Sequence, residues 1–123
     1  MRVIDTSIWI EIFLGSELGR RNLPLLSTPE AIIVPTIVQY EIFKWLSRER
    51  TSEDATLAIT FTGECDVRDL STDIAILAAE LSASRGLHAT DAIIFATAQI
   101  HEAPLVTCDA HFKDLPGVVY FEK

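Results

Sequence analysis

Short apolar runs alternate along this chain with longer stretches in which apolar residues recur every three or four positions. Short apolar runs predict buried strands, and the three-to-four spacing predicts amphipathic helices. The expected strands cover residues 2–5, 31–34, 65–69, 104–107 and 117–121. The expected helices include one carrying residues 8–13, a short one near 19–26, and others at 36–48, from 51 onward, 72–85 and 90–101.

The order of these elements indicates the fold class. The strands are short and mostly apolar, and helices separate most of them, which is typical of a parallel sheet covered on both faces. No repeat or linker interrupts the pattern. We therefore expect one α/β domain spanning residues 1–123.

Several residues should mark the ends of these elements. Thr6 or Ser7 is expected to cap the first helix, and Gly15 to end it. Pro35 should stop the second strand. The run Thr51-Ser52-Glu53-Asp54 resembles a capping box, and Gly86 should end the helix that begins at Thr72.

Composition restricts the function classes. The 123 residues include 10 basic and 18 acidic side chains, giving a net charge of −8. A general nucleic-acid binder needs a basic surface, so this charge argues against one unless clustered carboxylates hold cations. Cys65 and Cys108 are expected to be buried thiols in a reducing cytosol, not a disulfide pair. The N-terminal segment contains an acidic residue at Asp5 and so lacks the unbroken apolar stretch of a signal peptide. The longest apolar run is far too short for a membrane span. We therefore expect a soluble cytoplasmic protein.

Four acidic residues occupy positions where a carboxylate is unusual. Asp5 and Asp109 each follow an expected strand, at the edge of the sheet where ligands bind. Glu41 lies in the apolar stripe of its helix, and Asp91 opens a helix that is apolar almost all round. Each has a simple structural alternative: a helix cap for Asp5, an ion pair with Lys44 for Glu41, dipole compensation for Asp91 and a turn for Asp109.

Together the four acids predict a metal site. If they converge, their mutual repulsion requires cations, and oxygen ligands suit Mg²⁺ or Mn²⁺ better than Zn²⁺. Such ions activate water and bind phosphate, so phosphodiester hydrolysis is the natural chemistry. We expect the ion between Asp5, Asp91 and Asp109, with Glu41 binding it directly or through water. The three histidines show no metal-pair spacing, and His111 is expected to be a surface loop residue.

Four segments in order along the chain carry a family resemblance. They are Val3-Ile4-Asp5-Thr6-Ser7, residues 34–41 (VPTIVQYE), residues 87–98 (LHATDAIIFATA) and Leu105-Val106-Thr107-Cys108-Asp109, followed by Phe112 and Pro116-Gly117-Val118. With these segments the chain resembles the PIN-domain family, and within it the VapC-like toxin ribonucleases of toxin–antitoxin pairs.

The resemblance implies a five-stranded parallel sheet in the order 3-2-1-4-5, with the first and fourth strands adjacent. It implies that Asp5, Glu41, Asp91 and Asp109 form the catalytic acidic quartet, supported by the hydroxyls of Thr6, Ser7 and Thr107. It also implies cleavage of single-stranded RNA with Mg²⁺ or Mn²⁺, a homodimer, and silencing by an antitoxin protein.

Other functions fit parts of the pattern. A receiver-like phosphate-accepting domain needs an acidic pair beside Asp5, where Val3 and Ile4 stand, and an Asp-x-Asp phosphohydrolase fails because Ser7 replaces the second aspartate. A metal-dependent DNase or flap-type nuclease could use the same acids. A catalytically idle PIN module that only binds a partner is a further alternative.

Two surface predictions complete the sequence-based interpretation. RNA must be held by local basic residues, for which the candidates are Arg20, Arg21, Lys44, Arg48 and Arg50. The early helices also carry more large apolar side chains than one core face needs: Trp9, Ile12, Phe13, Phe43, Trp45 and Leu46. A deeply wedged helix would explain this excess, but we favour an apolar patch that binds a second copy, an antitoxin helix or both.

Overall fold

Five parallel strands form a single sheet in the order β3-β2-β1-β4-β5, as predicted. The computed structural model describes all residues from 1 to 123. The strands are β1 (Arg2–Ile4), β2 (Ile32–Pro35), β3 (Asp66–Arg68), β4 (Leu105–Thr107) and β5 (Val118–Tyr120). Because β1 pairs with both β2 and β4, it is the central strand, and its carboxyl end lies beside that of β4.

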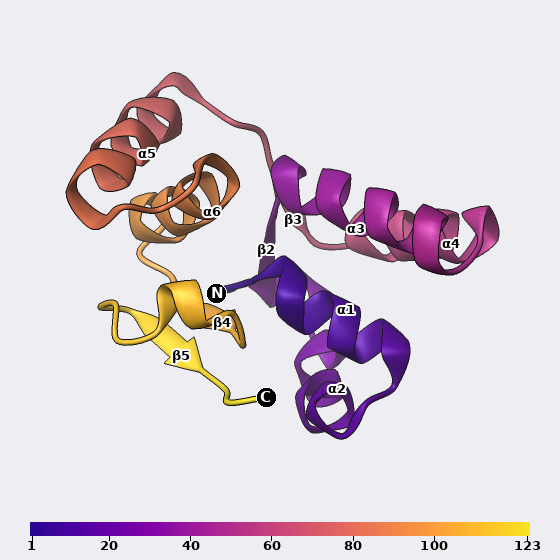
Figure 1. The fold of residues 1–123 in the computed structure, drawn as a ribbon. Helices are drawn as coiled ribbons and strands as arrows, with labels where there is room; N and C mark the ends of the chain where they lie inside the picture. Colours follow the sequence, from indigo (N-terminus) through magenta and orange to yellow (C-terminus); the bar gives the residue numbers. More distant parts are fainter.

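Six α-helices cover the two faces of this sheet (Figure 1). They are α1 (Thr6–Leu14), α2 (Glu17–Asn22), α3 (Thr36–Glu49), α4 (Ser52–Thr62), α5 (Thr72–Arg85) and α6 (Ala89–Ile100), with short 3₁₀ turns η1 (Leu23–Ser27), η2 (Pro29–Ala31) and η3 (Ala110–Phe112). Crossovers between parallel strands are right-handed, so this strand order puts α1–α4 on one face and α5–α6 on the other. No helix has both the length and the apolar character to span a bilayer.

The first helix begins one residue earlier than the sequence indicated. The expected cap at Thr6 or Ser7 is wrong, and the alternative that Asp5 caps this helix is confirmed: Asp5 is the N-cap, and its carboxylate accepts the Ser7 N–H at 3.4 Å. Aspartate is among the best N-cap residues because its side chain satisfies a free helix N–H. Gly15 ends α1 as predicted, with the left-handed backbone (φ 69°) that favours glycine.

Two further predictions concern the end of β2 and the start of α4. Pro35 was expected to stop the second strand, but it is the last residue of β2, where it lies opposite Arg68. A proline fits there because α3 begins at the next residue. The Thr51 hydroxyl accepts the Asp54 N–H at 3.0 Å, which confirms the predicted start of α4.

One apolar core fills the space between the sheet and its helices. Trp9, Phe95 and Phe112 are its largest fully buried side chains. Trp9 and Leu46 were expected to contribute to a surplus surface patch, but they are only 0% and 2% exposed. For Trp9 the reason is that Phe61 of α4 packs against it, with the ring centroids 6.0 Å apart.

The helices α1 and α2 approach each other closely at Gly19. A Cβ atom at this position would lie 2.0 Å from the backbone oxygen of Glu11 and 2.8 Å from the Cα of Ile12. No side chain fits in that space, so the turn between these helices depends on a glycine.

Candidate active site at the carboxyl edge of the sheet

Four structural elements bring the four predicted acids to one edge of the sheet. Asp5 and Asp109 follow the adjacent parallel strands β1 and β4. The helix α6 leads into β4 and runs back across the sheet, so its first turn, with Asp91, returns to the same edge. Glu41 lies in the second turn of α3, which begins directly after β2. Burial is the main cause that raises the pKa of Asp5, Glu41 and Asp91, and the charge of Asp109 raises the pKa of all three further.

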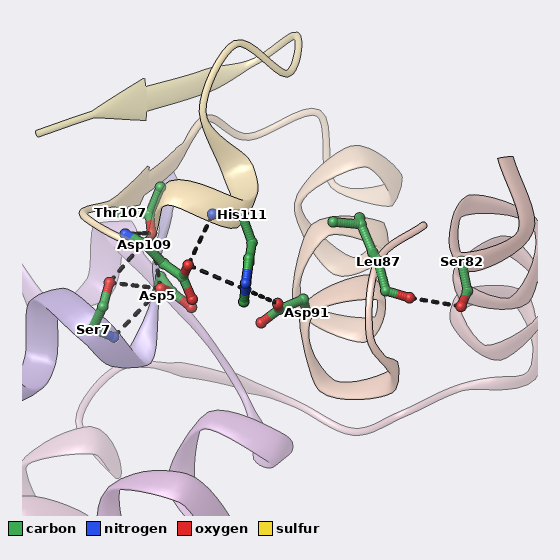
Figure 2. Close-up of polar contacts among 8 residues, drawn as sticks. All are labelled: Asp5, Ser7, Ser82, Leu87, Asp91, Thr107, Asp109 and His111. Carbon is green, nitrogen blue, oxygen red and sulfur yellow. Dashed lines mark hydrogen bonds and ion pairs between the residues drawn. The ribbon is translucent and has the colours of Figure 1, made fainter. Parts of the chain in front are cut away.

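Asp5 is the most deeply buried of the four acids, with 3% of its surface exposed. Its Oδ2 accepts hydrogen bonds from the Ser7 hydroxyl at 2.6 Å and the Thr107 hydroxyl at 2.8 Å (Figure 2). Burial raises the pKa of this carboxyl to about 6, although the bonds from Ser7 and Thr107 lower it. Because the hydrogen bonds end on Oδ2, Oδ1 remains available to a ligand.

The predicted supporting hydroxyls connect β1 to β4. The Ser7 hydroxyl lies 3.2 Å from that of Thr107 and accepts the Cys108 N–H at 3.1 Å. The Thr107 hydroxyl in turn accepts the Asp109 N–H at 2.9 Å. This network fixes the two strand ends relative to each other and therefore fixes the positions of Asp5 and Asp109.

Glu41 is oriented by Thr6, whose hydroxyl donates to Oε1 at 2.6 Å. Burial raises the pKa of Glu41 most, the Thr6 bond lowers it, and the charges of Asp91 and Asp109 raise it further. The alternative of a Glu41–Lys44 ion pair is not formed, because the Lys44 ammonium lies over the Tyr40 ring instead, 5.7 Å from its centroid. Glu41 therefore belongs to the acidic cluster.

His111 contacts two of the acids, which the sequence did not lead us to expect. Its backbone N–H donates to Asp109 Oδ1 at 2.9 Å, which closes the η3 turn. Its Nδ1 then lies 3.1 Å from Asp91 Oδ2 and 3.3 Å from Asp109 Oδ1 (Figure 2). The ring is on the surface as predicted, with its side chain 60% exposed, but it stands between two carboxylates. The only signal in the sequence was the spacing of a histidine two residues after a strand-end aspartate.

The donor set fits a divalent metal ion. Ligand atoms of Asp91, Asp109 and His111 all lie within 4.8 Å of one another. Burial is the largest cause that raises the pKa of Asp91, and the negative charge of Asp109 is the next. Without a metal ion, it is therefore unfavourable for all of these carboxyl groups to be ionised together. A cation would relieve this repulsion, and Asp5 Oδ1 and Glu41 offer further oxygens.

A hollow of about 380 Å³ adjoins the acids on the α3 side. Its lining combines Glu41 with two aromatic side chains, Tyr40 and Trp45, and two basic ones, Lys44 and Arg48. The other lining residues are Thr6, Ile10 and Thr90. Two of the five basic candidates, Lys44 and Arg48, are therefore beside the site. Arg50 lines a different groove, and Arg20 donates to the Gly15 carbonyl at 2.6 Å in the turn before α2.

Solved structures of similar fold include toxins from several bacteria. A chain of a toxin–antitoxin complex from Klebsiella pneumoniae is 28% identical, with a TM-score of 0.82 over 97% of this chain and 96% of that one. A chain of VapBC2 from Rickettsia felis, solved with a promoter DNA fragment, is 21% identical, with a TM-score of 0.76 over 98% of both chains. The Mycobacterium tuberculosis toxin VapC20, which cleaves the sarcin–ricin loop, is 19% identical, with a TM-score of 0.79 over 94% of this chain and 95% of that one.

The sequence itself also identifies the family. No curated protein sequence matches the chain significantly. The PIN domain family model, however, matches residues 2–118, which include nearly all of the strands and helices described above. This chain therefore belongs to the PIN domain family.

Proposed function

We propose that this protein is a metal-dependent endoribonuclease that cleaves single-stranded RNA and acts as the toxin of a toxin–antitoxin pair. The observation that carries this proposal is the convergence of Asp5, Glu41, Asp91 and Asp109 from four separate elements. A buried carboxylate with a raised pKa next to other acids is costly, and such clusters are typical of functional sites. The resemblance to the Klebsiella toxin–antitoxin complex supports the toxin role. Both cysteines are free thiols, which suits action in the reducing cytoplasm; Cys108 is buried as predicted, whereas Cys65 is only partly buried.

Each residue of the site has a defined part in this proposal. Asp5, Asp91 and Asp109 hold Mg²⁺ or Mn²⁺, and Glu41 contacts it directly or through water. When bound, the ion supplies positive charge for the phosphate and favours ionisation of a water molecule. Ser7 and Thr107 hold the Asp5 carboxylate in place, and Thr6 does the same for Glu41.

The proposed activity is tested with single-stranded RNA and single-stranded DNA of matched sequence. We expect the purified protein to cleave RNA in Mg²⁺ or Mn²⁺, to stop in excess EDTA, and to resume when the metal is restored. Cleavage of DNA alone would point instead to a DNase. No cleavage of either, with binding to a protein partner retained, would indicate an idle PIN module.

RNA binding should depend on the hollow beside Glu41. We propose that Lys44 and Arg48 contact RNA phosphates there, while Tyr40 and Trp45 provide surfaces on which bases stack. Changing both basic residues to glutamate should weaken RNA binding and flatten its salt dependence by roughly 0.7 per lost phosphate contact. Fluorescence anisotropy with labelled RNA in EDTA, at several salt concentrations, measures both effects. Arg85→Glu, at the end of α5, is the matched control, and an equal change in that variant would remove the hollow from the proposal.

The protein has a second groove, which is mainly apolar. It has a volume of about 480 Å³ and lies between α1, η1, α3 and α4, lined mainly by apolar side chains: Ile12, Phe13, Leu23, Leu26, Leu46, Leu57, Ala58 and Phe61, with Arg50 and Asp54. We propose that an apolar segment of the antitoxin binds here. Leu57, which is 67% exposed, is the most accessible of these side chains.

The partner prediction is checked by the solution mass of the purified protein, measured alone and with the protein product of any adjacent small gene. We expect a homodimer alone and a larger complex with that protein. Leu57→Asp should weaken the complex about tenfold or more, since it places a charge in an apolar contact. Val119→Asp, on the exposed edge strand β5, should leave the complex intact. A monomer that binds no such protein would contradict both the dimer and the antitoxin.

A further inference from the structure

The acidic cluster contains one ligand atom that is not an oxygen. His111 Nδ1 lies between Asp91 and Asp109, 3.1 Å from an oxygen of the first and 3.3 Å from an oxygen of the second. We propose that His111 binds the metal ion through Nδ1, an inference that rests on the metal-dependent function proposed above. This nitrogen would make the site prefer Mn²⁺ and similar transition metals over Mg²⁺.

The distances fit a shared coordination sphere. In an octahedral site with bonds of about 2.1–2.2 Å, neighbouring ligand atoms are separated by about 3.0–3.1 Å. The two separations from Nδ1 to carboxylate oxygens fall close to this length, so Nδ1 can occupy a corner next to each of these oxygens around one ion. A histidine that contacted only one acid, or pointed to solvent, would not meet this condition.

The position of the ring is set by the chain around it. The Asp109 side chain accepts the His111 N–H and so holds the backbone turn in which both residues lie. The ring of His88, the N-cap residue of α6, packs edge-on against that of His111 with centroids 5.7 Å apart. Because His111 is held on two sides, Nδ1 is aimed at the carboxylates before an ion arrives.

A nitrogen donor changes which metal is preferred. Mg²⁺ binds oxygen ligands and retains several waters, whereas imidazole favours transition metals. The other available donors, Asp5 Oδ1 and Glu41, are oxygens, so His111 alone supplies the discrimination. The sequence predicted a site made only of oxygen ligands, and the proposed site differs from it by one nitrogen ligand, from His111.

The test measures metal binding without RNA. Mn²⁺ titrations followed by electron paramagnetic resonance give its affinity, competition with Mg²⁺ gives the selectivity, and pulsed measurements detect nitrogen bonded to Mn²⁺. We expect a nitrogen signal in the unaltered protein and an affinity for Mn²⁺ at least roughly tenfold above that for Mg²⁺. In His111→Ala the nitrogen signal should vanish and most of the selectivity with it.

Two further variants make the result specific. His111→Asp restores a third oxygen, so it should bind Mg²⁺ better than His111→Ala does, without regaining the nitrogen signal. His101→Ala removes a histidine from the opposite end of α6 and should behave as the unaltered protein.

The outcomes separate this inference from the proposed function. Mn²⁺ binding without a nitrogen signal, or tighter metal binding in His111→Ala because the ring had competed with the ion, would overturn the role of His111 and leave the nuclease proposal standing. A nitrogen signal in a protein that cleaves no RNA would overturn the nuclease proposal and leave the metal site standing. Failure to bind any Mn²⁺ would overturn the inference outright.

Discussion

Asp5→Asn should reduce RNA cleavage by roughly a thousandfold or more and, at the same time, make the metal-free protein more stable. Asparagine has the same shape, and its amide oxygen can accept the hydroxyl bonds that Ser7 and Thr107 now donate to Oδ2. The amide nitrogen then occupies the place of Oδ1, where it cannot bind a cation. The fold is retained while the proposed ligand is lost.

The gain in stability follows from the raised pKa of Asp5. Its pKa is about 6 in the folded protein against 3.8 for an unperturbed aspartate, so ionising it at pH 7.5 costs the folded state about 3 kcal/mol. The folded state binds this proton more tightly than the unfolded state does. The resulting stability is therefore fully present below pH 4 and is lost as the pH rises through 6.

Chemical denaturation in EDTA at pH 5 and pH 7.5 checks this prediction. Asp5→Asn should exceed the unaltered protein in free energy of unfolding at pH 7.5, and the difference should shrink at pH 5. Asp73→Asn, in the first turn of α5, is the control and should cleave RNA normally. Normal cleavage by Asp5→Asn would exclude Asp5 from the catalytic site.

Gly19→Ala should lower the free energy of unfolding by about 3 kcal/mol, an unusually large loss for the addition of one methyl group. The new Cβ would lie 2.0 Å from a backbone oxygen of α1, and backbone cannot move aside as a flexible side chain can. The helix α2 must separate from α1, which also displaces Ile12 in the apolar groove between α1, η1, α3 and α4.

Denaturant titration of Gly19→Ala and of Glu17→Ala tests this explanation. Glu17 lies in the same helix but is exposed, so its replacement adds helix propensity without a clash and should change stability little. If Gly19→Ala were as stable as Glu17→Ala, the close contact between α1 and α2 would not be required.

The pattern of the chain predicted the sheet and the four acids because each acid interrupts an otherwise apolar element. Asp5 and Asp109 end strands, and parallel strands bring such residues to one edge. His111 could not be predicted in the same way. Its contact with Asp91 depends on a single 3₁₀ turn, η3, whose geometry has no repeating signature in the sequence.

The apolar surface was harder to predict for a different reason. Helical spacing shows how many apolar faces a helix has, but not how many neighbours cover them. Trp9 is buried because Phe61, 52 positions later, packs against it from α4. Phe43, on the outer side of α3, has no such cover and remains 45% exposed.

The adjacency of β1 and β4 also affects when the enzyme can first act. Asp5 is among the first residues to be synthesised, but the Thr107 hydroxyl that holds it comes 102 positions later. At about 5–20 residues per second, translation separates the two by roughly 5–20 seconds. During that interval β1 lacks at least one of its two neighbours, and the site lacks at least Asp109. If the protein is the ribonuclease proposed above, a growing chain still attached to its ribosome therefore cannot cleave the messenger RNA that encodes it until this central pair of strands has formed.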